Sequence, residues 1–97
     1  MLISGERGIL DLRGDLMETR VALLSIIVEN EDAVGEVNDL LHRFGKFIIG
    51  RLGIPYRQKN VNIICIAMDA PGDEINALAG ALSRIRGITA KATFSRV

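Results

Sequence analysis

Residues 20–28 read Arg-Val-Ala-Leu-Leu-Ser-Ile-Ile-Val, and this stretch decides the fold class of the chain. It is rich in aliphatic and β-branched residues and does not alternate between apolar and polar positions. Such a run is typical of a β-strand that is covered on both faces. Residues 61–68 form a second run of the same kind. We therefore predict two central strands of one sheet.

A helical pattern follows each of these two strands. Asn30 is a candidate N-cap of the first helix, and Gly45 is its expected end. Asp69 or Asp73 can cap the second helix, and Gly87 is its expected end. The apolar positions that recur at helical spacing are Val34, Val37, Leu40, Leu41 and Phe44 in the first helix, and Ile75, Leu78, Ala79, Leu82 and Ile85 in the second.

Two further strands complete the pattern. Residues 47–52 predict one strand, and residues 53–60 are expected to turn. Residues 88–95 alternate between apolar and polar, which is typical of an edge strand with one wet face. The order strand, helix, strand, strand, helix, strand predicts an α+β, ferredoxin-like βαββαβ sandwich, with a four-stranded antiparallel sheet and two helices on one face. In this topology the first and third strands are central, and the other two are edges.

One face of such a sheet has no helix to cover it, yet both central strands are apolar on both faces. That face would be exposed in a monomer. Burying a few of its Leu or Ile side chains would stabilise an assembly by roughly 1.5–3 kcal/mol each. We therefore expect a homo-oligomer, either a homodimer or a homotetramer, that associates through the open face or an edge strand.

The length of 97 residues and the composition limit the remaining possibilities. We assign residues 17–97 to one domain and residues 1–16 to an N-terminal extension, with Met17 as an alternative start to Met1. Hydrophobic residues make up 48% and aromatic residues 4%, so the core should be aliphatic. The net charge is zero, which argues against direct DNA binding as the main activity. The chain shows neither a membrane span nor a leader pattern, so we expect a cytoplasmic protein without a membrane partner.

No catalytic signature can be assembled from the chain. His42 is the only histidine, and it has no Cys or His partner at a metal-ligand spacing. Cys65 is the only cysteine, and its apolar neighbours predict a buried strand position in a reducing compartment. There is no Ser-His-Asp arrangement, phosphate-binding loop or paired-carboxylate motif. We therefore expect no enzymatic activity, metal or cofactor.

Charges are segregated along the chain. Residues 29–39 contain five acids and no base, whereas residues 43–59 contain five bases and no acid. One interpretation is that acids early and bases late complement the dipole of the first helix, while the other cations solvate a loop. The alternative is electrostatic pairing between subunits, or an anion site formed by Arg51, Arg57 and Lys59.

Residues 48–59 form the most unusual segment and read Ile-Ile-Gly-Arg-Leu-Gly-Ile-Pro-Tyr-Arg-Gln-Lys. Gly50 and Gly53 either make a bulge and a turn, or allow close approach of a ligand or partner backbone. Tyr56 either covers the core or anchors an interface, and we favour the interface because aromatic and arginine side chains dominate hot spots. The segment is expected to be a hairpin away from a conventional active site.

The junction after the first strand is the default position for a small molecule, because ligands in βαβ folds bind at strand carboxyl ends near helix N-termini. A neighbouring subunit could close that pocket. The candidate ligand-binding or interface residues are Glu29, Asn30, Glu31, Gly50, Arg51, Gly53, Tyr56 and Arg57.

The string Gly-Arg-Leu-Gly-Ile-Pro-Tyr-Arg at residues 50–57 also carries a family resemblance, together with residues 26–29, 38–42 and 69–71. Over residues 17–97 the chain resembles the iron-only hydrogenase system regulators, which have an ACT-like ferredoxin fold. Their similarity to the regulatory domain of the nickel-responsive repressor implies dimers or tetramers with ligand sites between subunits. This chain lacks the nickel-ligand cluster of that repressor and has no room for its DNA-binding domain before Arg20, which argues against nickel sensing and autonomous DNA binding.

Three functions follow as hypotheses. The leading one is a non-enzymatic, ACT-like oligomeric module that senses a small effector, is linked to iron-only hydrogenase expression or maturation, and passes its state to a partner. The second is an assembly module that docks a protein partner through Tyr56 and Arg57 and has no small-molecule ligand. The third is an enzyme that uses half-sites from two subunits.

Overall fold

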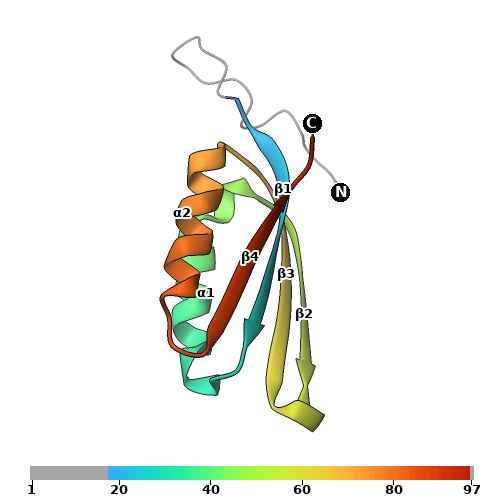
Figure 1. Ribbon diagram of the computed structural model, residues 1–97, viewed down its shortest axis with the longest axis vertical. Helices are drawn as coiled ribbons and strands as arrows, with labels where there is room; N and C mark the ends of the chain where they lie inside the picture. Colours follow the sequence, from blue (N-terminus) through green and yellow to red (C-terminus); the bar gives the residue numbers. More distant parts are fainter. Residues whose placement is uncertain (1–17, 97) are drawn as a thin grey trace.

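The computed structural model describes residues 18–96 and confirms the predicted α+β, ferredoxin-like βαββαβ fold. Four antiparallel strands pair in the order β2-β3-β1-β4, so the predicted central and edge strands are confirmed. Both helices lie on the same face of the sheet (Figure 1). The elements are β1 (Arg20–Val28), α1 (Val34–Arg43), β2 (Ile48–Tyr56), β3 (Val61–Ala70), α2 (Gly72–Ser83) and β4 (Ile88–Phe94). The predicted extension at residues 1–16 and the alternative start at Met17 lie outside the described residues.

The register of the sheet assigns each side chain to one of two faces. Leu24 is opposite Ile66, while its neighbour Leu23 is opposite Ala67. Directly opposed residues of an antiparallel pair share a face, and successive residues point to opposite faces. Even-numbered residues of β1 and β3 therefore face the helices, and odd-numbered residues face away from them.

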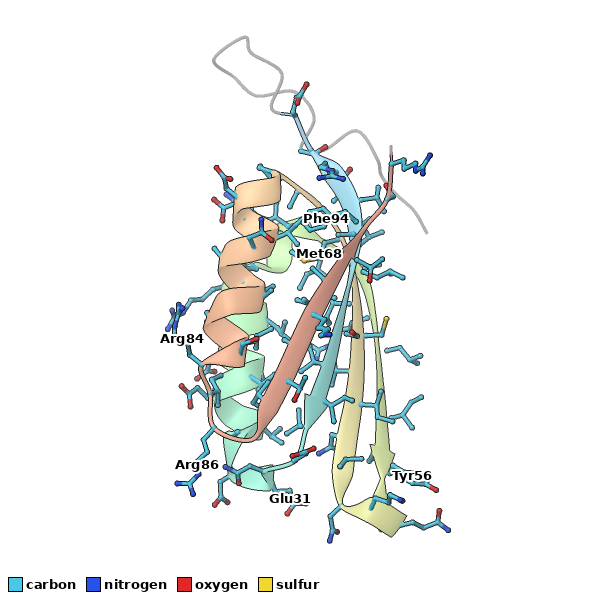
Figure 2. The ribbon with its side chains drawn as sticks, in the orientation of Figure 1. Glu31, Tyr56, Met68, Arg84, Arg86 and Phe94 are labelled. Carbon is cyan, nitrogen blue, oxygen red and sulfur yellow. The ribbon has the colours of Figure 1, made fainter. Side chains whose placement is uncertain are left out.

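The core between the sheet and the helices is aliphatic, as predicted. Leu24 and Ile66 from the sheet, and Val37 and Leu78 from the helices, are fully buried. Met68 also points from β3 into this layer (Figure 2). Within residues 18–96, no buried residue is polar or charged. Burial of aliphatic surface against the two helices is therefore what holds the layers together.

The hairpin between β2 and β3 is tighter than the sequence predicts. Strand β2 does not end at Leu52 but continues to Tyr56, which pairs with Val61. The turn consists of a short 3-10 helix, η3 (Arg57–Lys59), and Asn60 in the left-handed conformation at φ 55°. The glycine and proline of residues 53–55 suggested a turn, but an edge strand tolerates both because one side of its backbone is unpaired.

The predicted helix ends are partly confirmed. The Asn30 Oδ1 atom accepts a hydrogen bond from the Asp32 N–H at 3.1 Å and caps the 3-10 turn η1 (Glu31–Ala33), which leads into α1. Neither predicted aspartate caps α2, because its N-cap is Pro71 and Asp69 stays in β3. Gly45 does not close α1 with a left-handed residue but begins a second 3-10 turn, η2 (Gly45–Phe47). The last N–H bond of the helix comes from Phe44, which donates to both Leu40 and Leu41.

Cys65 does not occupy the predicted buried position. It is half-buried and lies opposite Ser25 on the face of the sheet that carries no helix. Apolar neighbours in the sequence suggested burial, but those neighbours, Ile64 and Ile66, point to the helix side. In the same described part of the chain, no helix is long and apolar enough to cross a membrane.

Candidate functional site

One end of the sheet brings together the two segments that the sequence analysis treated as separate. Val28, the last residue of β1, pairs with Asn62 near the start of β3. The junction between β1 and α1 therefore lies beside the β2–β3 hairpin, with Glu31 and Tyr56 at the same end of the molecule (Figure 2). The sequence placed the hairpin away from a conventional active site, and antiparallel pairing returns it to the end of the sheet that carries the strand-to-helix junction.

A hollow of about 360 Å³ lies between the junction and the hairpin. Its walls carry a carboxylate, a guanidinium, a phenol and two amides, together with two apolar groups. The lining residues are Glu31, Pro55, Tyr56, Arg57, Asn60, Val61 and Asn62.

The junction wall of this hollow is held in place by the loop that follows α2. The Glu29 N–H donates a hydrogen bond to the Gly87 carbonyl at 2.8 Å. Gly87 has a φ of 83°, and a Cβ atom at this position would lie only 2.5 Å from the Cβ of Asn30. Only glycine fits such a close approach at a positive φ. Together with the Asn30 cap, this contact fixes the backbone that presents Glu31.

The conformation of the hairpin wall is set by interactions within the turn itself. The Asn60 N–H donates to the Arg57 carbonyl at 3.2 Å, which closes the turn. Asparagine is among the few residues that tolerate the left-handed conformation seen here. The turn therefore presents Tyr56 and Arg57 from a paired strand end.

The charged and phenolic side chains of the hollow have no partner among residues 18–96. Within the described part of the chain, the side chains of Glu31, Tyr56 and Arg57 form no hydrogen bond or ion pair. All three are exposed. They are therefore free to bind a ligand or a partner.

The other predicted site residues lie elsewhere. The Arg51 Nη2 group faces the helices and donates a hydrogen bond to Asn38 Oδ1 of α1 at 3.3 Å. Lys59 does not line the hollow either, so Arg57 is the only one of the three cations of the suggested anion site that lines it. Glu29 and Asn30 support the hollow from the junction without lining it.

The two glycines of β2 have separate outcomes. The register shifts between Ile48 and Gly50, which confirms a bulge next to the first glycine. Gly53 pairs regularly with Ile64, so it makes no turn. A Cβ atom at either glycine would meet nothing within 4 Å, so close approach of the described chain does not explain them.

Four lining residues were missed by the sequence analysis, namely Pro55, Asn60, Val61 and Asn62. The strand pairing is what places them at the site, because Asn62 is opposite Val28 at the end of β1. That register is not visible in a single sequence, because periodicity within a strand does not show which residue of another strand it meets.

The outer surface of the helices has a second hollow, of about 330 Å³. Two acids and two bases line it, and Arg84, which directly follows α2, points away from the sheet (Figure 2). Across residues 18–96, no group of three or more His, Cys, Asp or Glu side chains is placed to hold a metal ion. The hollow beside the hairpin is therefore the better candidate site, since it lies at a strand carboxyl end.

The fold and this site define a small α+β module with a polar hollow at one end of the sheet. The chain belongs to the TM1266-like family, described as "Iron-only hydrogenase system regulator, putative", whose profile matches residues 20–92. This confirms the predicted family. The solved structure of the uncharacterized protein TM1266 from Thermotoga maritima is similar, with a TM-score of 0.78 and 38% sequence identity. That similarity covers 81% of this chain and 100% of the other. No curated protein matches this chain.

Proposed function

We propose that this protein is a non-enzymatic regulatory module of an iron-only hydrogenase system that senses a small ligand, in the ACT-like manner that the resemblance implies. The family description supports a regulatory role. The observation that carries the sensing role is that Glu31, Tyr56 and Arg57, whose side chains have no partner among the described residues, line one hollow of about 360 Å³. Small-molecule sites typically have volumes of about 300–1,000 Å³.

The side chains of the hollow define the chemistry of the ligand. The Arg57 guanidinium suits a carboxylate or phosphate, which it can bind through two parallel hydrogen bonds. The Glu31 carboxylate suits an ammonium or hydroxyl donor, and the Tyr56 ring offers an apolar wall with a polar tip. We therefore expect a small polar molecule that carries an anionic group and, several atoms away, a hydrogen-bond donor.

Isothermal titration of the full chain against amino acids, nucleotides and metal ions tests this proposal. One class should bind, and Arg57→Ala should weaken binding by about tenfold or more, because a hydrogen bond to a charged group contributes about 1.5–3 kcal/mol. Lys59→Ala is the matched control, since it removes the same charge from the same turn without touching the hollow. Equal losses in both variants, or no binding of any compound, would contradict ligand sensing at this site.

A second candidate function is docking of a protein partner through the hairpin. It is favoured by the exposure of Tyr56, which is 42% accessible and therefore does not cover the core. Affinity capture with the wild type and Arg57→Ala tests this function. A partner that the wild type retains and the variant loses would support docking, whereas an unchanged partner set would exclude it.

A further inference from the structure

The face of the sheet opposite the helices is apolar and uncovered in the described chain. Eight large hydrophobic side chains of the described residues are exposed, and seven of them lie on this open face. Their exposed fractions run from 39% to 59%. In Figure 2, Tyr56 points away from the helices on this side. The seven are Val21, Leu23 and Ile27 from β1, Leu52, Ile54 and Tyr56 from β2, and Ile63 from β3.

A row of three isoleucines crosses the open face. Ile54, Ile63 and Ile27 are paired across three neighbouring strands and form this row. In the next two rows toward the other end of the sheet, Cys65 lies beside Leu52, and Ala67 lies beside Leu23. In a two-fold pair, the isoleucine row of each copy can pack against these two rows of the other, because an isologous interface satisfies both contacts at once.

The polarity of the open face also suits a second copy. Its charged side chains among the described residues, Asp69 and Lys91, lie at the end of β3 and on edge strand β4. Ser25, near the middle, donates its hydroxyl proton to the Lys91 carbonyl at 3.3 Å. Burial of the centre would therefore leave the Ser25 hydroxyl paired, and interface centres are typically depleted of charge.

The size of the face fits what a stable dimer needs. With standard strand spacing and rise, β1, β2 and β3, together with the margin formed by β4, have a flat footprint of about 19 Å by 30 Å, or about 570 Å². The accessible surface of the side chains that project from this footprint is larger than the footprint itself, so it approaches the roughly 800 Å² that each partner buries in a standard interface.

We propose that a second copy of this chain covers the open face and forms a two-fold, face-to-face sandwich of sheets centred near Cys65. Packed sheets lie about 10 Å apart, which lets the apolar side chains of both copies interdigitate. The contact uses β1, β2 and β3, while the polar side chains of β4, Thr89, Lys91 and Thr93, lie at its margin.

Light scattering of the full chain over a range of concentrations is the first test. The wild type should have at least the mass of a dimer, and Leu23→Lys should shift the mass to that of a monomer. Leu23 is half exposed in the single chain, so the variant is expected to fold, which circular dichroism would check. Ala77→Lys adds the same charge at an exposed position of α2 and should leave the dimer intact. A wild-type monomer, or a dimer that Leu23→Lys retains, would overturn the proposal.

The reactivity of Cys65 with a thiol reagent is the second test, and the chain contains no other cysteine. In the wild type, the reaction should slow several-fold as the protein concentration rises. In Leu23→Lys it should be fast at every concentration. A monomer with a reactive Cys65 would show that nothing covers the face. A monomer with a protected Cys65 would show that residues 1–16 of the same chain cover it. Either result would reject the second copy.

Discussion

The two faces of the sheet differ far more in environment than in composition. Leu23 is 50% exposed and Leu24 is completely buried, although they are identical neighbours in β1. Ile26 and Ile27 repeat this contrast, with 0% and 41% exposure. In a strand, adjacent side chains point to opposite faces, and only one face here has helices packed on it. Hydrophobicity alone therefore does not distinguish the face that lies under the helices from the open face.

The largest expected effect is the difference between two alanine substitutions in this pair. Leu24→Ala should lower the free energy of unfolding by about 2–5 kcal/mol, because it leaves a cavity under the helices. Leu23→Ala should cost less than about 1 kcal/mol at low protein concentration, because its side chain is half exposed there. Urea denaturation followed by circular dichroism measures both.

The stability costs of the same two variants should also depend differently on protein concentration. If a second copy covers the open face, the cost of Leu23→Ala should rise with protein concentration, because the dimer adds to the stability of the folded state. The cost of Leu24→Ala should not change with protein concentration, because this side chain lies under the helices of its own chain. Equal costs at low concentration would contradict the assignment of the two faces.

A somewhat smaller effect is expected at the loop that joins α2 to β4 on the covered side. Gly87→Ala should destabilise the protein by about 1–3 kcal/mol, because alanine is strained at a φ of 83° and its Cβ would collide with Asn30. Gly35→Ala, in α1 with open space around it, should instead stabilise by up to about 1 kcal/mol. Thermal melting of the two variants would reveal a shift in opposite directions. A Gly87→Ala variant as stable as the wild type would show that this loop can move.

Asn30→Ala should lower the free energy of unfolding by about 1 kcal/mol, because it removes the N-cap of the turn that leads into α1. The variant removes the acceptor for the Asp32 N–H at the start of η1. Asn76→Ala, on an exposed position of α2, makes no such cap and should change stability by less than about 0.5 kcal/mol. Chemical denaturation of both variants under identical conditions decides whether the cap matters.

The smallest effect on stability is expected at Arg51, whose side chain lies on the helix side of β2. Arg51→Ala loses one exposed hydrogen bond to Asn38, so stability should change by no more than about 0.5 kcal/mol. Its affinity for a ligand of the hairpin hollow should match that of the wild type, because Arg51 does not line the hollow. A loss of affinity as large as that of Arg57→Ala would mean that the site extends to the helix side.

Much of the fold could be predicted from the sequence. The order of the elements, the central position of β1 and β3 and the aliphatic core were all confirmed. These features follow from periodicity and composition within single segments. The predicted end of β2 was wrong, because Gly53 and Pro55 are turn-forming residues that an edge strand can also contain.

The candidate site was only partly predictable. Glu31, Tyr56 and Arg57 were singled out for local reasons, and the structure brings them together at one hollow. Arg51 was grouped with them by sequence proximity, but strand alternation turns it toward α1. Cys65 was placed in the core for the same kind of reason, and alternation again puts it on the other face.

The sequence by itself determined the order of the strands and helices, that the core is aliphatic and that both faces of the central strands are apolar. These properties depend on neighbouring residues and on local backbone preferences. Only the tertiary structure decided which member of each apolar pair lies under the helices, and that the hairpin meets the first strand-to-helix junction. Both depend on the antiparallel register that pairs Val28 with Asn62, and that register arises from contacts between residues distant in the chain.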